Sequence, residues 1–140
     1  MPWLFRSMKE CVTGSPVVGE NARTLGVRPG NDVPATAQDD IVLPGSGGLS
    51  VAPDDPMNLP SHRRPPEFQG VGKDPVWMVS SEELGPDLAY RPDPDRPGHG
   101  FVEPTGPATL VAFQRALAKT REAWRKIGQW PVEWGETDAT

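Results

Sequence analysis

Short runs of alternating apolar and polar residues extend over most of the chain and predict a series of short β-strands. Pro, Gly, Asp and Asn residues separate these runs, and such residues are typical of the turns between strands. The run at 76–80 is the clearest of the set. The predicted strands cover residues 2–8, 41–43, 49–51, 76–80, 88–91 and 99–103.

A different spacing follows residue 108, where the chain contains no proline until residue 131. Thr109 can cap the start of a helix there, and Gly128 is typical of a helix end. The pattern therefore predicts one long C-terminal helix, followed by a short acidic tail at 129–140. The apolar residues that fall on one side of this helix are Leu110, Phe113, Leu117, Trp124 and Ile127.

The composition limits the fold that these elements can build. Among 140 residues, 18 are Pro and 15 are Gly, and this excess excludes a helical bundle over the whole chain because proline breaks helix interiors. The length is that of one domain with one modest core. We expect a small α+β domain over residues 1–128, in which long Pro- and Gly-rich loops connect short strands and one helix closes the fold.

Charge and cysteine content narrow the partners and the location. The formal net charge of −5 argues against nucleic acid and anionic membranes as partners. The single Cys11 cannot form an internal disulfide and fits a reduced, cytoplasmic environment. The first apolar run is far too short for a signal peptide or a membrane span, so export would need another route. The few His and Cys residues have no metal-ligand spacing, so no metal site is expected.

One candidate site is the glycine-rich turn at 45–48, which delivers Ser50 into a predicted strand. Glycines such as Gly48 let a ligand approach the backbone, whose N–H groups can hold phosphate. The turn lacks the Lys-Ser/Thr pair of a P-loop. A tight turn without a ligand is the alternative interpretation.

A second candidate is His99, which shares one strand face with Phe101 and Glu103 if residues 99–103 are extended. An imidazole, an aromatic ring and a carboxylate on one face can hold a ribose and stabilise developing positive charge. A structural hydrogen bond between the histidine and a nearby carboxylate is the alternative interpretation. The sequence shows no Ser-His-Asp order and no HExxH, CxxC or GxSxG motif.

Two arginines beside apolar residues complete the candidates. Arg6 lies in the first predicted strand and Arg28 in the segment LGVRPG. The planar guanidinium group suits bidentate contacts to phosphate. Surface ion pairs are the alternative interpretation for both.

An ordered set of segments is similar to the Tse-two family of type VI secretion toxins, which have an ADP-ribosyltransferase-like fold. The segments run from about residue 4 to residue 127, and their order carries the resemblance. They are LFRS, LGVRPGND, VLPGSGGLSVAPDDP, DPVWMVS, LGPDLAYRPD and HGFVEPTGP, followed by the predicted helix.

The resemblance implies a small mixed, mostly antiparallel β-sandwich of the ADP-ribosyltransferase type and a bacterial cytotoxic effector that uses NAD as a substrate. It also implies a cognate immunity protein and a secretion apparatus as partners. Arg6, Arg28, Gly48 and Ser50 match positions expected to bind NAD, and Ser50 and His99 match positions needed for toxicity. Glu103 is the candidate for the catalytic carboxylate of the superfamily, although the family motif does not demand one there.

The implied reaction is transfer of ADP-ribose from NAD through an oxocarbenium-like transition state. Two alternatives stay open. The chain could be a toxin that uses this fold without NAD chemistry, by binding a target or cleaving RNA, or a non-enzymatic protein-interaction domain.

Overall fold

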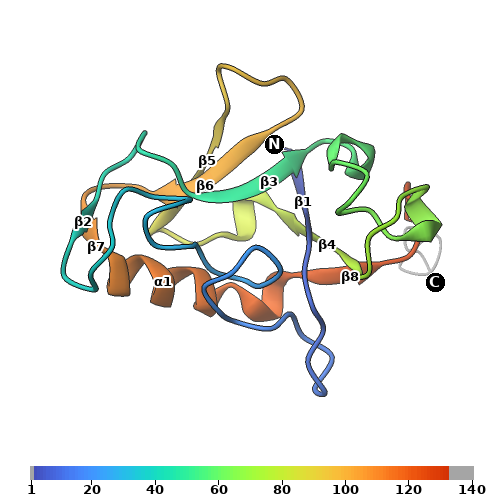
Figure 1. Ribbon diagram of the computed structural model, residues 1–140, viewed down its shortest axis with the longest axis horizontal. Helices are drawn as coiled ribbons and strands as arrows, with labels where there is room; N and C mark the ends of the chain where they lie inside the picture. Colours follow the sequence, from blue (N-terminus) through green and yellow to red (C-terminus); the bar gives the residue numbers. More distant parts are fainter. Residues whose placement is uncertain (1, 133–140) are drawn as a thin grey trace.

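The computed structural model describes residues 2–132, in which six strands form one antiparallel sheet of order β5-β6-β3-β1-β4-β8 (Figure 1). Strands β2 (Ile41–Val42) and β7 (Ala108–Thr109) pair separately, next to the start of helix α1 (Leu110–Lys119). The strands of the large sheet are β1 (Trp3–Ser7), β3 (Leu49–Pro53), β4 (Val76–Ser80), β5 (Leu88–Pro92), β6 (Gly100–Pro104) and β8 (Arg125–Ile127).

These elements confirm a small α+β arrangement with a mostly antiparallel sheet and one α-helix. The strand predicted at 76–80 has the observed bounds, and the other predicted strands each overlap an observed one. Short 3-10 turns interrupt the connections at Pro56–Asn58, Pro66–Phe68, Ser81–Glu83 and Arg121–Ala123. None of the helices within residues 2–132 has the length and hydrophobicity that crossing a lipid bilayer requires.

The C-terminal helix is much shorter than predicted. It ends at Lys119, where the Thr120 hydroxyl donates a hydrogen bond to the carbonyl of Leu117 at 2.6 Å. A side chain that bonds the backbone in this way competes with helix continuation. Trp124 and Ile127 are buried as predicted, but the chain reaches them through a 3-10 turn and strand β8, which pairs with β4.

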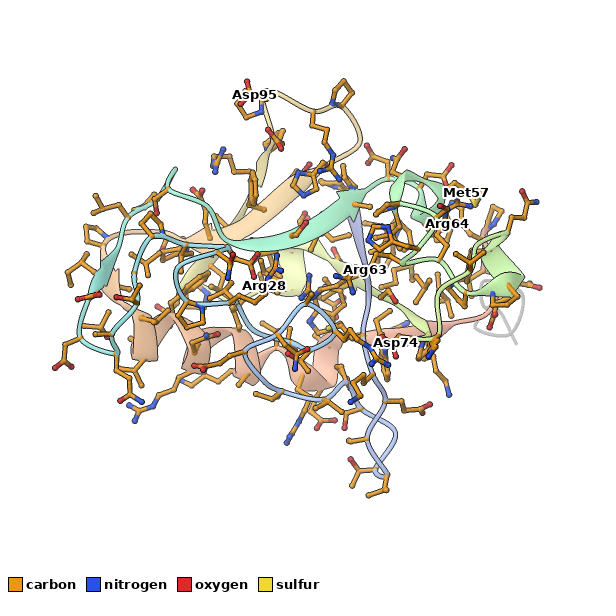
Figure 2. The ribbon with its side chains drawn as sticks, viewed as in Figure 1. Arg28, Met57, Arg63, Arg64, Asp74 and Asp95 are labelled. Carbon is orange, nitrogen blue, oxygen red and sulfur yellow. The ribbon has the colours of Figure 1, made fainter. Side chains whose placement is uncertain are left out.

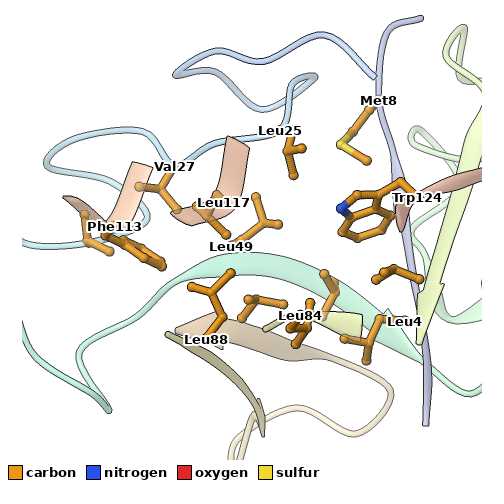
Figure 3. Close-up of a cluster of buried hydrophobic side chains, with 14 of the residues drawn as sticks. Leu4, Met8, Leu25, Val27, Leu49, Leu84, Leu88, Phe113, Leu117 and Trp124 are labelled. Atoms are coloured by element: carbon orange, nitrogen blue, oxygen red, sulfur yellow. The ribbon is translucent and has the colours of Figure 1, made fainter. Parts of the chain in front are cut away.

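Two apolar clusters pack on opposite faces of the sheet. The larger cluster lies between the sheet and helix α1 and includes Leu4, Phe113, Leu117 and Trp124 (Figure 3). The smaller cluster includes Phe5, whose ring meets that of Trp130 edge-on at 4.9 Å. Successive residues of β1 thus enter opposite clusters, as strand geometry requires. Residues 133–140 of the predicted acidic tail lie outside the described residues.

Strand β3 changes partners along its length. Its first half pairs with β6, from Leu49 opposite Val102 to Val51 opposite Gly100. Its second half pairs with β1, with Phe5 opposite Ala52. Strands β1 and β3 therefore separate beyond Phe5, and the next residue of β1 is Arg6. This opening between two strands of one sheet is where the candidate site begins.

Candidate functional site

A cleft of about 570 Å³, including space open to solvent, lies where β1 and β3 separate. Four of the residues selected from the sequence line the cleft, namely Arg6, Arg28, Ser50 and His99. They come from β1, a loop, β3 and the end of the β5–β6 connection, so the fold gathers distant segments around one hollow.

Arg6 lies at the base of this cleft with 6% of its surface exposed. Its Nη1 donates to the carbonyl of Ser50 at 2.8 Å, which bridges the opening between β1 and β3. Its Nη2 donates to the carbonyls of Thr24 at 2.8 Å and Ala22 at 3.3 Å, and its Nε also donates to Thr24 at 3.2 Å. One guanidinium group therefore joins three chain segments.

The charge of Arg6 has no carboxylate in contact among residues 2–132, since its hydrogen-bond partners are neutral carbonyls. Burial lowers the pKa of Arg6 to about 10, so the group stays charged at neutral pH. These four hydrogen bonds use four of the five N–H donors of a guanidinium, and the remaining one is on Nη1. A buried cation with a spare donor at the base of a cleft is complementary to an anionic ligand.

A chain of three side chains leads into the same cleft. Asp93 Oδ2 lies 2.8 Å from Nδ1 of His99, and Nε2 of His99 lies 2.5 Å from Oγ of Ser50. The Asp93 carboxylate also accepts a hydrogen bond from the backbone N–H of Asp95 at 2.9 Å. That N–H, and then His99, keep the pKa of Asp93 below its usual range, so Asp93 is ionised at neutral pH.

An ionised carboxylate only accepts hydrogen bonds, so Asp93 requires the proton of His99 on Nδ1. The Nε2 atom of a neutral His99 is then an acceptor, and the Ser50 hydroxyl donates to it. The lone pairs of Ser50 Oγ remain to accept a hydrogen bond from a ligand hydroxyl or amide in the cleft. His99 is further held by the Phe101 ring, which it meets edge-on at 4.9 Å.

Three more arginines line the cleft. Arg28 is held by Asp32 through an ion pair at 2.9 Å, and the hydrogen bonds that Arg28 donates to this carboxylate raise the pKa of Arg28. The guanidinium groups of Arg63 and Arg96 have no hydrogen bond or ion pair within residues 2–132. Figure 2 shows that Arg28 and Arg63 come from different loops, and both line the cleft. The cleft is therefore cationic, although the whole chain is acidic.

The His99 ring meets the Phe101 ring, and Glu103 follows Phe101 by two residues in β6, but Glu103 does not line the cleft. It is buried, its Oε1 forms an ion pair with Arg91 at 2.6 Å, and the same atom accepts from the N–H of Gly45. Arg91 also lies over the Phe101 ring at 4.8 Å. These contacts give Glu103 a structural role in joining β5, β6 and the glycine-rich turn.

Gly48 also lies outside the lining of the cleft. A Cβ atom there would lie 2.4 Å from the carbonyl oxygen of Val102, and its φ of +155° is rare for other residues. Its N–H donates to the carbonyl of Asp32 at 3.0 Å. The glycine is needed because β3 and β6 approach closely at this point, which places Ser50 two residues later.

Sequence reasoning missed three residues of the site, which are Asp93, Arg63 and Arg96. Asp93 lies in the segment PDPDRPG, whose composition indicates only a turn. The turn closes when the N–H of Asp93 donates to the carbonyl of His99 at 3.0 Å, which brings the carboxylate to the imidazole. The available signal was an aspartate six residues before the candidate histidine, within a loop too tight to separate them.

No cluster of three or more His, Cys, Asp or Glu side chains suited to a metal ion occurs in the part of the chain that the structure describes. Comparison with known proteins adds no relative to this description. No protein-family model, no curated protein and no solved structure matches the chain.

Proposed function

We propose that this chain is a bacterial cytotoxic effector that transfers ADP-ribose from NAD to a cytosolic target. The observation that carries the proposal is the buried Arg6, whose charge has only carbonyl partners, beside the Ser50–His99 pair in one cleft. A cation in this position binds the pyrophosphate of a dinucleotide, and the hydroxyl and imidazole beside it suit a ribose.

The charge distribution supports an anionic substrate. Arg6, Arg63 and Arg96 bring positive charge that no contacting carboxylate in residues 2–132 offsets, whereas Asp32 offsets Arg28. A pyrophosphate supplies the opposite charge, and the planar guanidinium groups bind its oxygens bidentately.

The chemistry of the step fits these residues. Loss of nicotinamide leaves positive charge on the ribose, as in glycoside hydrolysis, and the reaction gains from holding the sugar in one orientation. Ser50 Oγ accepts a hydrogen bond from the substrate, and Asp93 keeps His99 and Ser50 in one arrangement. The ADP-ribosyltransferase type of the fold, with two sheet portions joined through β3, is part of the same proposal.

The biological context of the proposal rests on the resemblance to the Tse-two toxins. A secretion apparatus delivers the chain into the target cell, where it acts in the cytoplasm, and a cognate immunity protein neutralises it in the producer. Expression inside a bacterium tests this part directly. Growth arrest by the parent chain, relieved by Ser50→Ala or His99→Ala, is the expected result, and normal growth with the parent would overturn it.

The enzymatic part is tested by incubating the purified chain with NAD and bacterial lysate. Nicotinamide release and labelled ADP-ribose on a lysate component are expected, and both should be lost in Ser50→Ala and His99→Ala. Ser46→Ala is the matched control because Ser46 lies in the neighbouring turn and bonds only a local carbonyl among residues 2–132. A toxic chain that consumes no NAD would exclude the proposed reaction.

A serine hydrolase is the second candidate, and the Asp93–His99–Ser50 chain is the observation that favours it. The three residues then act as a nucleophile, its base and an orienting carboxylate. A fluorophosphonate probe separates the two functions. Covalent labelling of Ser50 supports the hydrolase, whereas an unlabelled serine in a chain that releases nicotinamide supports the transferase.

A further inference from the structure

The cleft contains a proton-accepting chain but lacks a free carboxylate. Asp32 is the one carboxylate residue in the cleft lining within residues 2–132, and it is bonded to Arg28. Glu103, the expected catalytic carboxylate, is held by Arg91 outside the cleft. A base for the acceptor must therefore come from another group. The bare Nε2 of His99 is 2.5 Å from a serine hydroxyl that faces the cleft.

We infer that Asp93, His99 and Ser50 form a proton relay that activates the acceptor of ADP-ribose, and that this acceptor is a neutral hydroxyl group. The inference rests on the proposed function and goes beyond it by naming the acceptor class and the base. His99 and Ser50 are the catalytic residues of the relay. Asp93 is a positioning residue, because it acts on the substrate only through His99.

The step is balanced by one bond broken, one bond formed and one proton moved. The bond between ribose C1″ and the nicotinamide nitrogen breaks, and its electron pair leaves with neutral nicotinamide. The acceptor oxygen bonds to C1″ and gives its proton to Ser50 Oγ, while the proton of Ser50 passes to Nε2 of His99. Asp93 stabilises the resulting imidazolium, which returns its proton to water.

The charges around the relay select among acceptors. The groups that line the cleft with His99 are Arg6 from β1, Arg28 and Asp32 from one loop, Arg63 from another and Arg96 from the β5–β6 connection. This positive surface repels a lysine or arginine side chain as acceptor. A phosphate monoester is largely doubly ionised at neutral pH, so its oxygen needs no base and leaves the relay without a role. A neutral hydroxyl is the class that needs the base and is not repelled.

The test measures nicotinamide release and transfer to methanol, a minimal hydroxyl acceptor, with inorganic phosphate as the comparison. Asp93→Asn keeps the size of the side chain but no longer stabilises the imidazolium. We expect the rate at saturating NAD to fall by about 10²-fold or more, with the KM for NAD changed by less than about threefold.

Two further variants separate a relay from a structural role. Asp95→Asn is the matched control, because the Asp95 side chain is exposed at the outer end of the same connection (Figure 2) and only its backbone contacts Asp93. It should keep the parent rate. His99→Gln retains a hydrogen-bonding group but cannot take the proton, and combining it with Asp93→Asn should cost no more than His99→Gln alone.

The outcomes distinguish failure of the proton relay from failure of the proposed transferase activity. Methyl ADP-ribose as the main product, lost in Asp93→Asn at unchanged thermal stability, supports the relay. Parent-like rates in Asp93→Asn, or preferred transfer to phosphate that ignores Asp93, overturns the relay while the proposed transferase stands. A parent chain that releases no nicotinamide at any pH overturns the proposed function and the relay together.

Discussion

Arg6 combines two requirements that are usually met by different residues. It closes the opening between β1 and β3 through carbonyl groups, and it brings a buried positive charge to the base of the cleft. Lysine preserves the charge but lacks the planar fork that reaches several carbonyls at once. Arg6→Lys therefore separates the charge from the geometry.

We predict that Arg6→Lys lowers the free energy of unfolding by about 1–3 kcal/mol, because the carbonyls of Thr24 and Ser50 lose donors. Denaturant unfolding measures this loss, and NAD binding should weaken by at least about tenfold in the folded variant. Arg121→Lys, at a half-exposed position in the turn after helix α1, is the control and should change neither quantity. An unchanged affinity for NAD in Arg6→Lys would contradict the proposed contact between Arg6 and NAD.

Cys11 provides a test of side-chain chemistry away from the cleft. Its Sγ lies 2.9 Å from the hydroxyl of Thr13, and hydrogen bonds from Thr13, ahead of those from Ser15, lower the pKa of Cys11 to about 6. The thiolate is the reactive form, so alkylation should be fast at pH 7 and slow down as the pH falls below 6.

Thr13→Val removes the main hydrogen bond, so it should raise the pKa of Cys11 and slow alkylation at pH 7. Ser15→Ala should have a smaller effect, because the Ser15 hydroxyl is 3.7 Å from the sulfur. Mass spectrometry after timed exposure to iodoacetamide gives both rates. Equal rates in the parent and Thr13→Val would contradict the assigned cause.

At the scale of elements, the entry into β3 depends on the contact between Gly48 and β6. A side chain at Gly48 would overlap the carbonyl of Val102, whereas one at Gly45 meets nothing within 4 Å. Both glycines have positive φ, of +155° and +87°. The pair therefore separates backbone strain from steric overlap.

We predict that Gly48→Ala costs about 2–4 kcal/mol of folding free energy, through strain and overlap together. Gly45→Ala should cost only the backbone part, about 1–2 kcal/mol. Thermal unfolding compares the two variants. Equal losses would show that the close approach of β3 to β6 contributes nothing to stability.

The local sequence pattern predicted an element correctly where a single signal, such as an apolar run or a capping residue, determines it. The strand at 76–80 follows from its apolar run, and its burial on both sides agrees with the two clusters. The helix after Thr109 was also predictable, because Thr109 caps it by accepting from the N–H of Ala112. Its end was not, because the stripe residues Trp124 and Ile127 are buried by a turn and a strand instead of a longer helix.

The site was predictable in part for a related reason. Arginine, serine and histidine types at Arg6, Ser50 and His99 indicate chemistry on their own, and the structure brings them together. Their common cleft depends on the partner change of β3, which no local pattern encodes. Glu103 was the expected carboxylate, and Asp93 was not among the candidates. A turn closure brings Asp93 to His99, whereas an ion pair holds Glu103 to Arg91.

At the scale of the whole molecule, the chain carries a cationic cleft on an acidic body. The net charge is −5, yet Arg6, Arg63 and Arg96 face one hollow. This contrast between a cationic cleft and an acidic surface favours binding of small anions in the cleft over binding of extended polyanions to the surface.

Salt should therefore weaken binding of an anionic ligand more than binding of a neutral one. From about 0.1 M to about 1 M salt the screening length falls from about 10 Å to about 3 Å. We predict that the affinity for ADP drops several-fold over this range while that for adenosine does not, as measured by calorimetry. Arg63→Ser combined with Arg96→Ser should flatten the salt dependence of ADP binding. Equal salt dependence for the two ligands would argue against a cationic subsite.

The sheet is interrupted where β3 changes partners, and Arg6 bridges this interruption through its hydrogen bond to the carbonyl of Ser50. A variant that lacks the proposed activity still needs a donor for those carbonyls, so the fold itself requires the arginine. Replacing His99 or Ser50 should therefore disturb the fold less than replacing Arg6.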